Sequence, residues 1–172
     1  MKINFDKIIL VDANDNSLGE MDKYQAHEHP AKLHRASSVW LVNSKGQVLL
    51  QKRSDKKIVG AGWWGNAVCG NLRPGESYED CARRRLKEEI GVGRGVGIGT
   101  RLSTERDSEY LEIKPIFKFT YKAYCNEKYG EHEMDQVFFA KYDGKVVLNK
   151  DEVSEVAWVD FDDLVGQVGR LG

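Results

Sequence analysis

The 172-residue chain lacks a long apolar segment. No run approaches the 18 or so apolar residues that a membrane-spanning helix needs. Residues 1–15 contain a basic residue and a short apolar patch, but acidic residues interrupt the patch and no small-residue cleavage site follows. A secretory signal peptide is therefore not expected. The sequence predicts a protein that does not associate with a membrane.

An excess of basic residues is also missing. Lys and Arg together number 26 and Asp and Glu number 27, which gives a formal net charge of −1. A protein that neutralises many backbone phosphates of a nucleic acid usually has a clear basic excess. The composition therefore argues against nucleic acid as a partner. Any phosphate group must be bound at a local site.

Cysteine is scarce, with Cys69, Cys81 and Cys125 the three present. Three is an odd number, and their spacings match neither a disulfide framework nor a CxxC zinc site. Disulfides are rare where the compartment is reducing. We therefore expect reduced thiols and a cytoplasmic location.

The length and the 41% of hydrophobic residues fit a single domain that spans residues 1–172. Period-two patterns and turn residues predict strands at 6–12, 36–42, 47–53, 66–71, 113–124, 133–142 and 156–159. Helices are predicted at 77–91 and 162–168. Many strands with one strong helix and one weaker helix indicate the α+β class.

The segment 77–91 carries the clearest helical pattern. Ser77 and Asp80 have the spacing of a capping box, and Gly91 is a typical C-terminal stop. A core-facing stripe recurs every fourth residue and consists of Tyr78, Ala82, Leu86 and Ile90. The helix should therefore pack this stripe against the sheet.

A cluster of charged side chains lies beside that stripe. Arg85, Glu88 and Glu89 are spaced i, i+3 and i+4, so they share one face of the helix. Two carboxylates placed in this way can hold Mg²⁺, which binds oxygen ligands and commonly bridges to a substrate phosphate. Taken alone, such a cluster is more often a solvated helix face with Arg–Glu pairs.

The loop before the helix changes this interpretation, because loop and helix together resemble the signature of the Nudix superfamily. The matching residues are Gly70, Glu76, Arg84, Glu88, Glu89, Gly91 and Val92. The resemblance implies the α+β Nudix fold, a mixed β-sheet sandwiched between helices. Arg85 departs from the pattern of the hydrolases, which carry a glutamate there. One carboxylate fewer weakens a multi-metal cluster, whereas a guanidinium binds phosphate oxygens well.

Arginine at this position is typical of the Nudix-type isopentenyl diphosphate isomerases, and other motifs of that family recur in order. They are Lys23-Tyr24-Gln25-Ala26-His27, Leu33-His34, Arg53 with Lys57, Asn66-Ala67-Val68-Cys69-Gly70, Tyr121 and Glu131-His132-Glu133. The resemblance extends from about residue 12 to residue 160. It implies an enzyme that interconverts isopentenyl and dimethylallyl diphosphate by adding one proton and removing another.

The resemblance also implies a role for each matching residue. Cys69, Glu133 and Tyr121 would be catalytic, with Glu133 and Tyr121 delivering a proton and Cys69 removing one from the opposite face of the carbon chain. The residues expected to bind the diphosphate are Lys23, Arg53, Lys57 and Arg85. The expected metal ligands are His27, His34, Glu131 and Glu133 for one divalent ion, Mn²⁺ or Zn²⁺, and Glu89 for Mg²⁺.

Two departures from the family keep other functions open. Asn71 stands where the family has a metal-binding histidine, so its status as a ligand is doubtful, and an amide oxygen favours Mg²⁺ or Mn²⁺ over zinc. The helical tail of the family, with a tryptophan that shelters a cation, is not found after residues 158–160, unless Trp63 or Trp64 substitutes. The alternatives are a Nudix hydrolase of a nucleoside or prenyl diphosphate and a non-catalytic protein that binds a diphosphate. The oligomeric state is not predicted.

Overall fold

A computed structural model describes residues 7–93 and 111–168. The glycine-rich segment that follows the predicted helix, for which the sequence predicts a flexible connector, lies largely outside the described residues. No described helix is long and apolar enough to cross a membrane.

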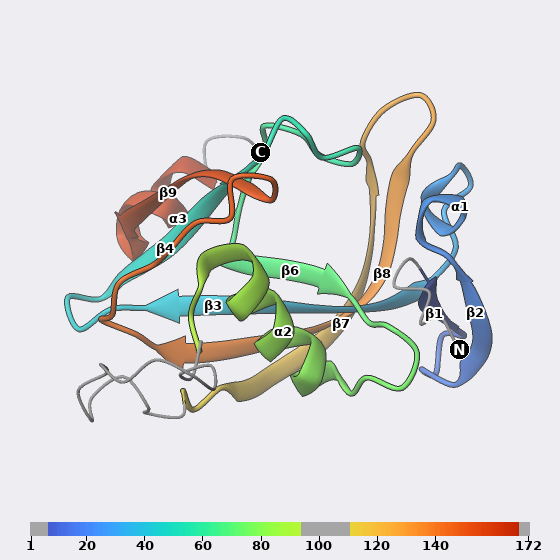
Figure 1. Ribbon diagram of the computed structural model, residues 1–172, viewed down its shortest axis with the longest axis horizontal. Helices are drawn as coiled ribbons and strands as arrows, with labels where there is room; N and C mark the ends of the chain where they lie inside the picture. The colour runs from blue at the N-terminus through green and yellow to red at the C-terminus, as the bar shows by residue number, and fades with distance from the viewer. Residues whose placement is uncertain (1–6, 94–110, 169–172) are drawn as a thin grey trace, which may run out of the picture.

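The described strands form one mixed sheet (Figure 1). Its strands are β1 (Lys7–Val11), β2 (Ser17–Asp22), β3 (His34–Val42), β4 (Gln47–Arg53), β5 (Trp64–Gly65), β6 (Val68–Asn71), β7 (Lys114–Tyr124), β8 (Gly130–Lys141) and β9 (Val153–Asp160). Strand β3 is central, since it pairs antiparallel with β1, β4 and β6 and parallel with β8. Strand β7 extends the sheet beyond β8, and β9 extends it beside β4.

Three described helices accompany the sheet: α1 (Lys23–His27), α2 (Tyr78–Ile90) and α3 (Phe161–Val168). Helix α2 lies across β3 and β6, whereas α3 follows β9 at another part of the sheet (Figure 1). The predicted capping box is confirmed, because Ser77 and Asp80 bond each other's backbone N–H groups. Gly91 ends α2 with a φ of 69°, a left-handed conformation that glycine adopts without strain.

The main core lies between α2 and the sheet. It includes Val39, Leu41, Leu49, Val68, Leu86, Ile90 and Phe138, each at most 3% exposed. Burial of each such side chain contributes on the order of 1.5–3 kcal/mol. A smaller cluster around Leu72 and Cys81 continues the core toward β1. This packing fixes the position of the helix face that bears Arg85 relative to β6.

The predicted α+β class is confirmed, but three elements were not predicted: α1, β2 and the two-residue strand β5. Helix α1 has only five residues, too few for a visible helical period, and it depends on Asp22, whose carboxylate accepts hydrogen bonds from the backbone N–H groups of Tyr24 and Gln25. Strand β2 is largely exposed and pairs only with β1 among the described strands. A partly exposed strand without β-branched residues gives no period-two signal.

Candidate active site

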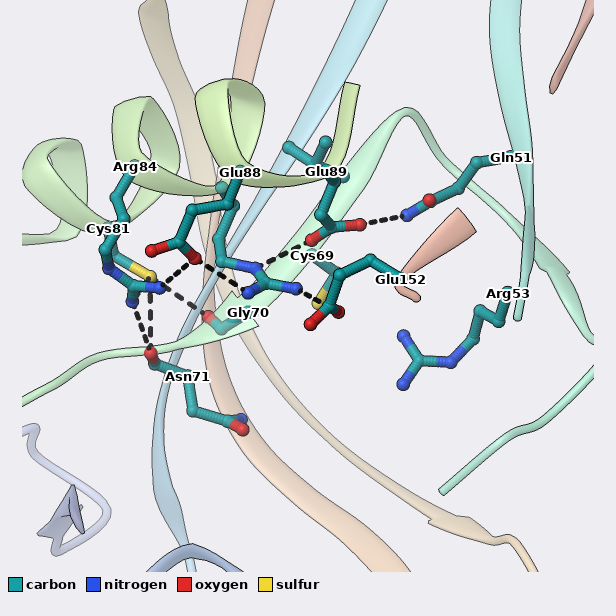
Figure 2. Close-up of polar contacts among 12 residues, drawn as sticks. Gln51, Arg53, Cys69, Gly70, Asn71, Cys81, Arg84, Glu88, Glu89 and Glu152 are labelled. Carbon is teal, nitrogen blue, oxygen red and sulfur yellow. Dashed lines mark hydrogen bonds and ion pairs between the residues drawn. The ribbon is translucent and has the colours of Figure 1, made fainter. Parts of the chain in front are cut away.

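A cavity of about 600 Å³ opens where α1, α2, β4, β6, β7 and β8 meet. All four side chains expected to bind the diphosphate line it, and so do Cys69, Tyr121 and Glu133. Figure 2 shows Arg53 and Glu152 reaching toward the same space from different elements. The cavity has a basic half near α2 and β4 and an acidic half near β8.

The basic half contains Lys23, Arg53, Lys57 and Arg85. Burial and the nearby charges of Lys57, Arg85 and Arg53 lower the pKa of Lys23 to about 8. Burial is the larger cause, and the contributions of the three other cations reflect that all four side chains line one cavity. Arg53 is oriented by hydrogen bonds from Nε and Nη2 to the carbonyl of Val59, at 3.2 and 3.0 Å.

Arg85 is bound by carboxylates on every side. Its Nε donates to Glu89 Oε1 at 2.7 Å, Nη1 donates to Glu88 Oε2 at 3.0 Å, and Nη2 donates to Glu152 Oε2 at 2.9 Å. The other oxygen of Glu89 accepts a hydrogen bond from Gln51 Nε2 at 2.8 Å (Figure 2). The two helix carboxylates expected to hold metal are thus partly neutralised by the arginine that replaces a third.

Gly70 explains how Arg85 reaches this position. A Cβ atom on Gly70 would lie 2.6 Å from Cγ of Arg85 and 2.7 Å from Cδ, far inside van der Waals contact. Only a residue without a side chain allows the arginine to lie flat on β6. The glycine at this position of the signature therefore has a steric reason in this chain.

The acidic half contains a group that could hold a metal ion, formed by His27, His34, Glu131 and Glu133, with ligand atoms within 4.8 Å of one another. Both histidines contact backbone carbonyls through Nδ1, His27 at 2.6 Å and His34 at 2.7 Å. A carbonyl only accepts, so Nδ1 of each ring carries a proton and Nε2 faces the centre of the group.

Two atoms of this group support a metal site. His34 Nε2 is buried and has no hydrogen-bond partner among the described residues. Glu131 Oε2 is also buried, and its nearest partner is His27 Nε2, which carries no proton when the proton of a neutral ring is on Nδ1, so two acceptors then face each other. His34 Nε2 lies 3.6 Å from Glu133 Oε1, which is beyond hydrogen-bond distance. Buried polar atoms without partners are costly, and a cation would satisfy both. The donor set fits a divalent ion.

The pairing of strands brings these ligands together. In the parallel register of β3 and β8, His34 is the partner of Glu133, and Glu131 lies two residues earlier on the same face of β8. His27 reaches the group from the end of α1, and its Nε2 lies 3.0 Å from Glu131 Oε2. Asn71, the doubtful ligand, lies beside the group, and its amide donates to Glu133 Oε1 at 2.9 Å.

The three expected catalytic side chains also meet here. The hydroxyl of Tyr121 donates to Glu133 Oε2 at 2.7 Å, and the sulfur of Cys69 lies 3.9 Å from the same oxygen. A carbon chain does not fit between sulfur and oxygen at 3.9 Å. If Cys69 and Glu133 act on opposite faces of a substrate, they must move apart when it binds.

Proton affinities differ sharply within this group. Burial and the charge of Glu133 raise the pKa of Cys69 well above its usual value, so its thiol is protonated. Burial opposes ionisation of Glu133, but His34 and Tyr121 lower its pKa to about 2. In the ligand-free protein the sulfur therefore holds a proton more strongly than the carboxylate does.

Three residues of the cavity region were not predicted from the sequence. Asp135 continues the alternation of Glu131 and Glu133 along β8, so the period-two rule would have placed it on the same face. It accepts a hydrogen bond from Ser38 at 2.7 Å, and burial with nearby Glu133 raises its pKa to about 7. Gln51 and Glu152 carry no sequence signal.

Comparisons with known proteins show which family the chain resembles. The NUDIX domain family matches residues 32–171. The isopentenyl-diphosphate Delta-isomerase 2 of Aromatoleum aromaticum is 39% identical over 165 residues, which cover 96% of this chain and 78% of that protein. The isopentenyl-diphosphate Delta-isomerase of Serratia proteamaculans is 34% identical over 163 residues, which cover 95% of this chain and 81% of that protein.

Solved structures show the same fold. DR0079 from Deinococcus radiodurans superposes with a TM-score of 0.69 at 20% identity and covers 95% of this chain and 89% of its own. The MutT protein from Methanosarcina mazei superposes with a TM-score of 0.57 at 22% identity, covering 78% of this chain and 81% of its own. The predicted Nudix fold is confirmed. With the matching domain and the identities above, the chain belongs to the Nudix superfamily and, within it, to the family of the isopentenyl-diphosphate Delta-isomerases.

Proposed function

We propose that this protein interconverts isopentenyl and dimethylallyl diphosphate. The observation that carries the proposal is the convergence in one cavity of a thiol, a carboxylate and a phenol with four cations. The cations suit the diphosphate, and Cys69, Tyr121 and Glu133 would then lie beside the hydrocarbon part of the substrate. The names of the relatives support the same activity.

The reaction needs one proton added at the terminal carbon of the alkene and one removed from the allylic carbon. Cys69 and Glu133 are neighbouring groups that can each carry a proton, so one can give a proton while the other accepts. We assign delivery to Glu133, assisted by Tyr121, and removal to Cys69. This order requires Glu133 to be protonated and Cys69 to be a thiolate when the alkene is bound, so a proton must first pass from sulfur to carboxylate, which lie 3.9 Å apart.

The residues that would hold a divalent ion are His27, His34, Glu131 and Glu133, and Glu89 would hold Mg²⁺ beside the diphosphate. When bound, the first ion would supply positive charge that orients and acidifies the carboxyl of Glu133. The nitrogen and oxygen donors are compatible with Mn²⁺ or Zn²⁺. Closure of the cavity would protect the tertiary cation from water.

A Nudix hydrolase is the second candidate. Its favouring observation is that Glu88 and Glu89 are both present on α2. Against it, Arg85 binds both carboxylates at 3.0 and 2.7 Å, which lowers their capacity to hold several metal ions. A diphosphate-binding protein without catalysis is the third candidate.

One experiment separates these candidates. The purified protein is incubated with isopentenyl diphosphate and divalent metal, and separately with nucleoside diphosphate compounds. Dimethylallyl diphosphate as product supports the isomerase, and release of phosphate or a monophosphate supports the hydrolase. Binding without product supports the third candidate and contradicts the proposal. We further propose a cytoplasmic location, because all three cysteines are free.

A further inference from the structure

Glu152 lies in the basic half of the cavity, in the turn that precedes β9. Its Oε2 accepts from Arg85 Nη2 at 2.9 Å and from Lys57 Nζ at 2.5 Å. Partial burial opposes ionisation, but Arg85 and Lys57 lower the pKa of Glu152 to about 2. A single carboxylate oxygen therefore bridges two of the cations expected to bind the substrate.

This position is where a phosphate oxygen would have to bind. The guanidinium of Arg85 directs one nitrogen to each of Glu89, Glu88 and Glu152. These bonds use three of the five N–H groups of Arg85, but a phosphate oxygen that binds Arg85 on the side facing Lys57 must displace a carboxylate. The question is which of the three can leave.

Two of these carboxylates are firmly held. The side chain of Glu89 is 2% exposed and is also bound by Gln51. Glu88 accepts a second hydrogen bond from Arg84 at 3.1 Å and belongs to the same helix as Arg85. Displacing either one would leave a buried charge unpaired or break a helix-bound network.

Glu152 is different, because it approaches from another element and bridges Arg85 to Lys57, which neither helix carboxylate does. Its side chain is 25% exposed, compared with 35% for Glu88 and 2% for Glu89. Its backbone is fixed, since its N–H donates to Asn149 at 2.9 Å and its carbonyl accepts from Ser54 at 3.0 Å. The side chain can thus rotate toward solvent while the turn stays in place. That rotation would free Arg85 and Lys57 together.

We propose that Glu152 is an internal competitor of the diphosphate, which occupies the phosphate position between Arg85 and Lys57 and is exchanged for the substrate. The inference rests on the proposed function only in taking this basic half as the diphosphate site. Because Glu152 must be displaced first, the affinity of the protein for every diphosphate ligand is lowered, for substrate and product alike. Weakening such uniform binding costs nothing in the chemical step and speeds release of product.

The test measures binding of inorganic pyrophosphate by calorimetry, in metal-free buffer, to the wild type and to Glu152→Gln. Removing the competing charge should tighten pyrophosphate binding by about tenfold, since a charge-assisted contact no longer has to be broken. In steady-state assays KM should fall while kcat stays equal or decreases. Glu155→Gln, an exposed carboxylate on β9, is the matched control and should bind pyrophosphate as the wild type does.

Unchanged or weaker binding by Glu152→Gln overturns the proposal, because it would mean that Glu152 only positions the two cations. If that variant does not fold, Glu152→Asp keeps the charge but is too short to bridge both cations. It should also bind pyrophosphate more tightly, and equal or weaker binding overturns the proposal as well. Tighter pyrophosphate binding in a protein that makes no dimethylallyl diphosphate would reject the isomerase and retain the competitor.

Discussion

Cys69 differs from the other two cysteines in what its sulfur contacts. The sulfur of Cys81 donates to the carbonyls of Gly70 and Asn71, within the core beneath α2. Cys125 lies just beyond the end of β7, at the cavity wall. Only Cys69 faces Glu133. Its role thus depends on a neighbour far away in the sequence.

Replacement of Cys69 by alanine should lower kcat by at least about 10²–10⁴-fold, because one partner of the proton exchange is lost. Binding of inorganic pyrophosphate should remain within twofold or so of the wild type, since the four cations are untouched. Turnover of isopentenyl diphosphate and calorimetry measure the two effects. Cys125→Ala is the matched control and should keep its activity. Near wild-type turnover by Cys69→Ala would remove the thiol from the mechanism.

Asn71 provides a test of the metal group, that is, the proposed ligands His27, His34, Glu131 and Glu133. Its amide already points at Glu133 Oε1 from 2.9 Å, so a histidine there would bring a third imidazole to the same centre. Asn71→His should raise Zn²⁺ affinity on the order of tenfold. Competition with a chromophoric chelator measures this affinity. The exposed Asn14→His should leave it unchanged, and no gain by Asn71→His would place the ion elsewhere.

Among single residues, the sequence predicted the site side chains that lie within family motifs. It did not predict the site side chains that lie outside such motifs. Cys69, Tyr121 and Glu133 were predicted, and the structure brings them into contact, although their roles stay predictions. Glu152 was not predicted, since its partner Arg85 is on α2 and nothing local marks the turn. A residue that acts only through a distant ion pair leaves no periodicity or spacing to detect.

At the scale of elements, α2 and β6 fit together because Gly70 has no side chain. Gly70→Ala should push the stem of Arg85 off the strand, since its Cβ would lie 2.6 Å from Cγ of the arginine. We expect pyrophosphate affinity to fall by about tenfold as the contacts of Arg85 are lost. Calorimetry checks this.

The matched control is Gly166→Ala in α3, where a Cβ would meet nothing within 4 Å. It should bind pyrophosphate as the wild type does and, as a glycine removed from a helix, should not lower stability. If Gly70→Ala also keeps wild-type affinity, the arginine does not need the strand surface, and Arg85 would not be fixed by this packing.

Elements were predictable where a local pattern fixed them. The caps and the apolar stripe of α2 are contained in its own residues, so its bounds were predicted closely. Helix α1 is too short to show a stripe and exists because Asp22 caps it and because Ala26 and His27 are buried by other elements. Such tertiary support overrides weak local propensity, and a single sequence does not reveal it.

At the scale of the whole molecule, the metal group connects α1, β3 and β8, which are distant in the sequence. An ion that binds only the folded state stabilises it by RT ln(1 + [L]/Kd), about 2.7 kcal/mol at a hundredfold excess over Kd. Removing divalent metal with a chelator should therefore lower Tm by about 5–10 °C. Differential scanning calorimetry measures the shift.

His34→Gln should abolish most of this metal-dependent shift, because a buried ligand atom is lost. His29→Gln, which replaces a histidine outside the group, should keep it. Equal melting temperatures with and without metal in the wild type would contradict a structural contribution from the ion.

The parallel partnership of His34 and Glu133 has a consequence for the newly made chain. Parallel neighbours cannot be joined by a tight hairpin, so the register of β3 and β8 exists only after the intervening chain has been placed. A nascent or partly unfolded copy thus presents single histidines and carboxylates, each a poor chelator by itself. Immature molecules in the cell should therefore not scavenge divalent ions, and metal loading should follow maturation rather than precede it.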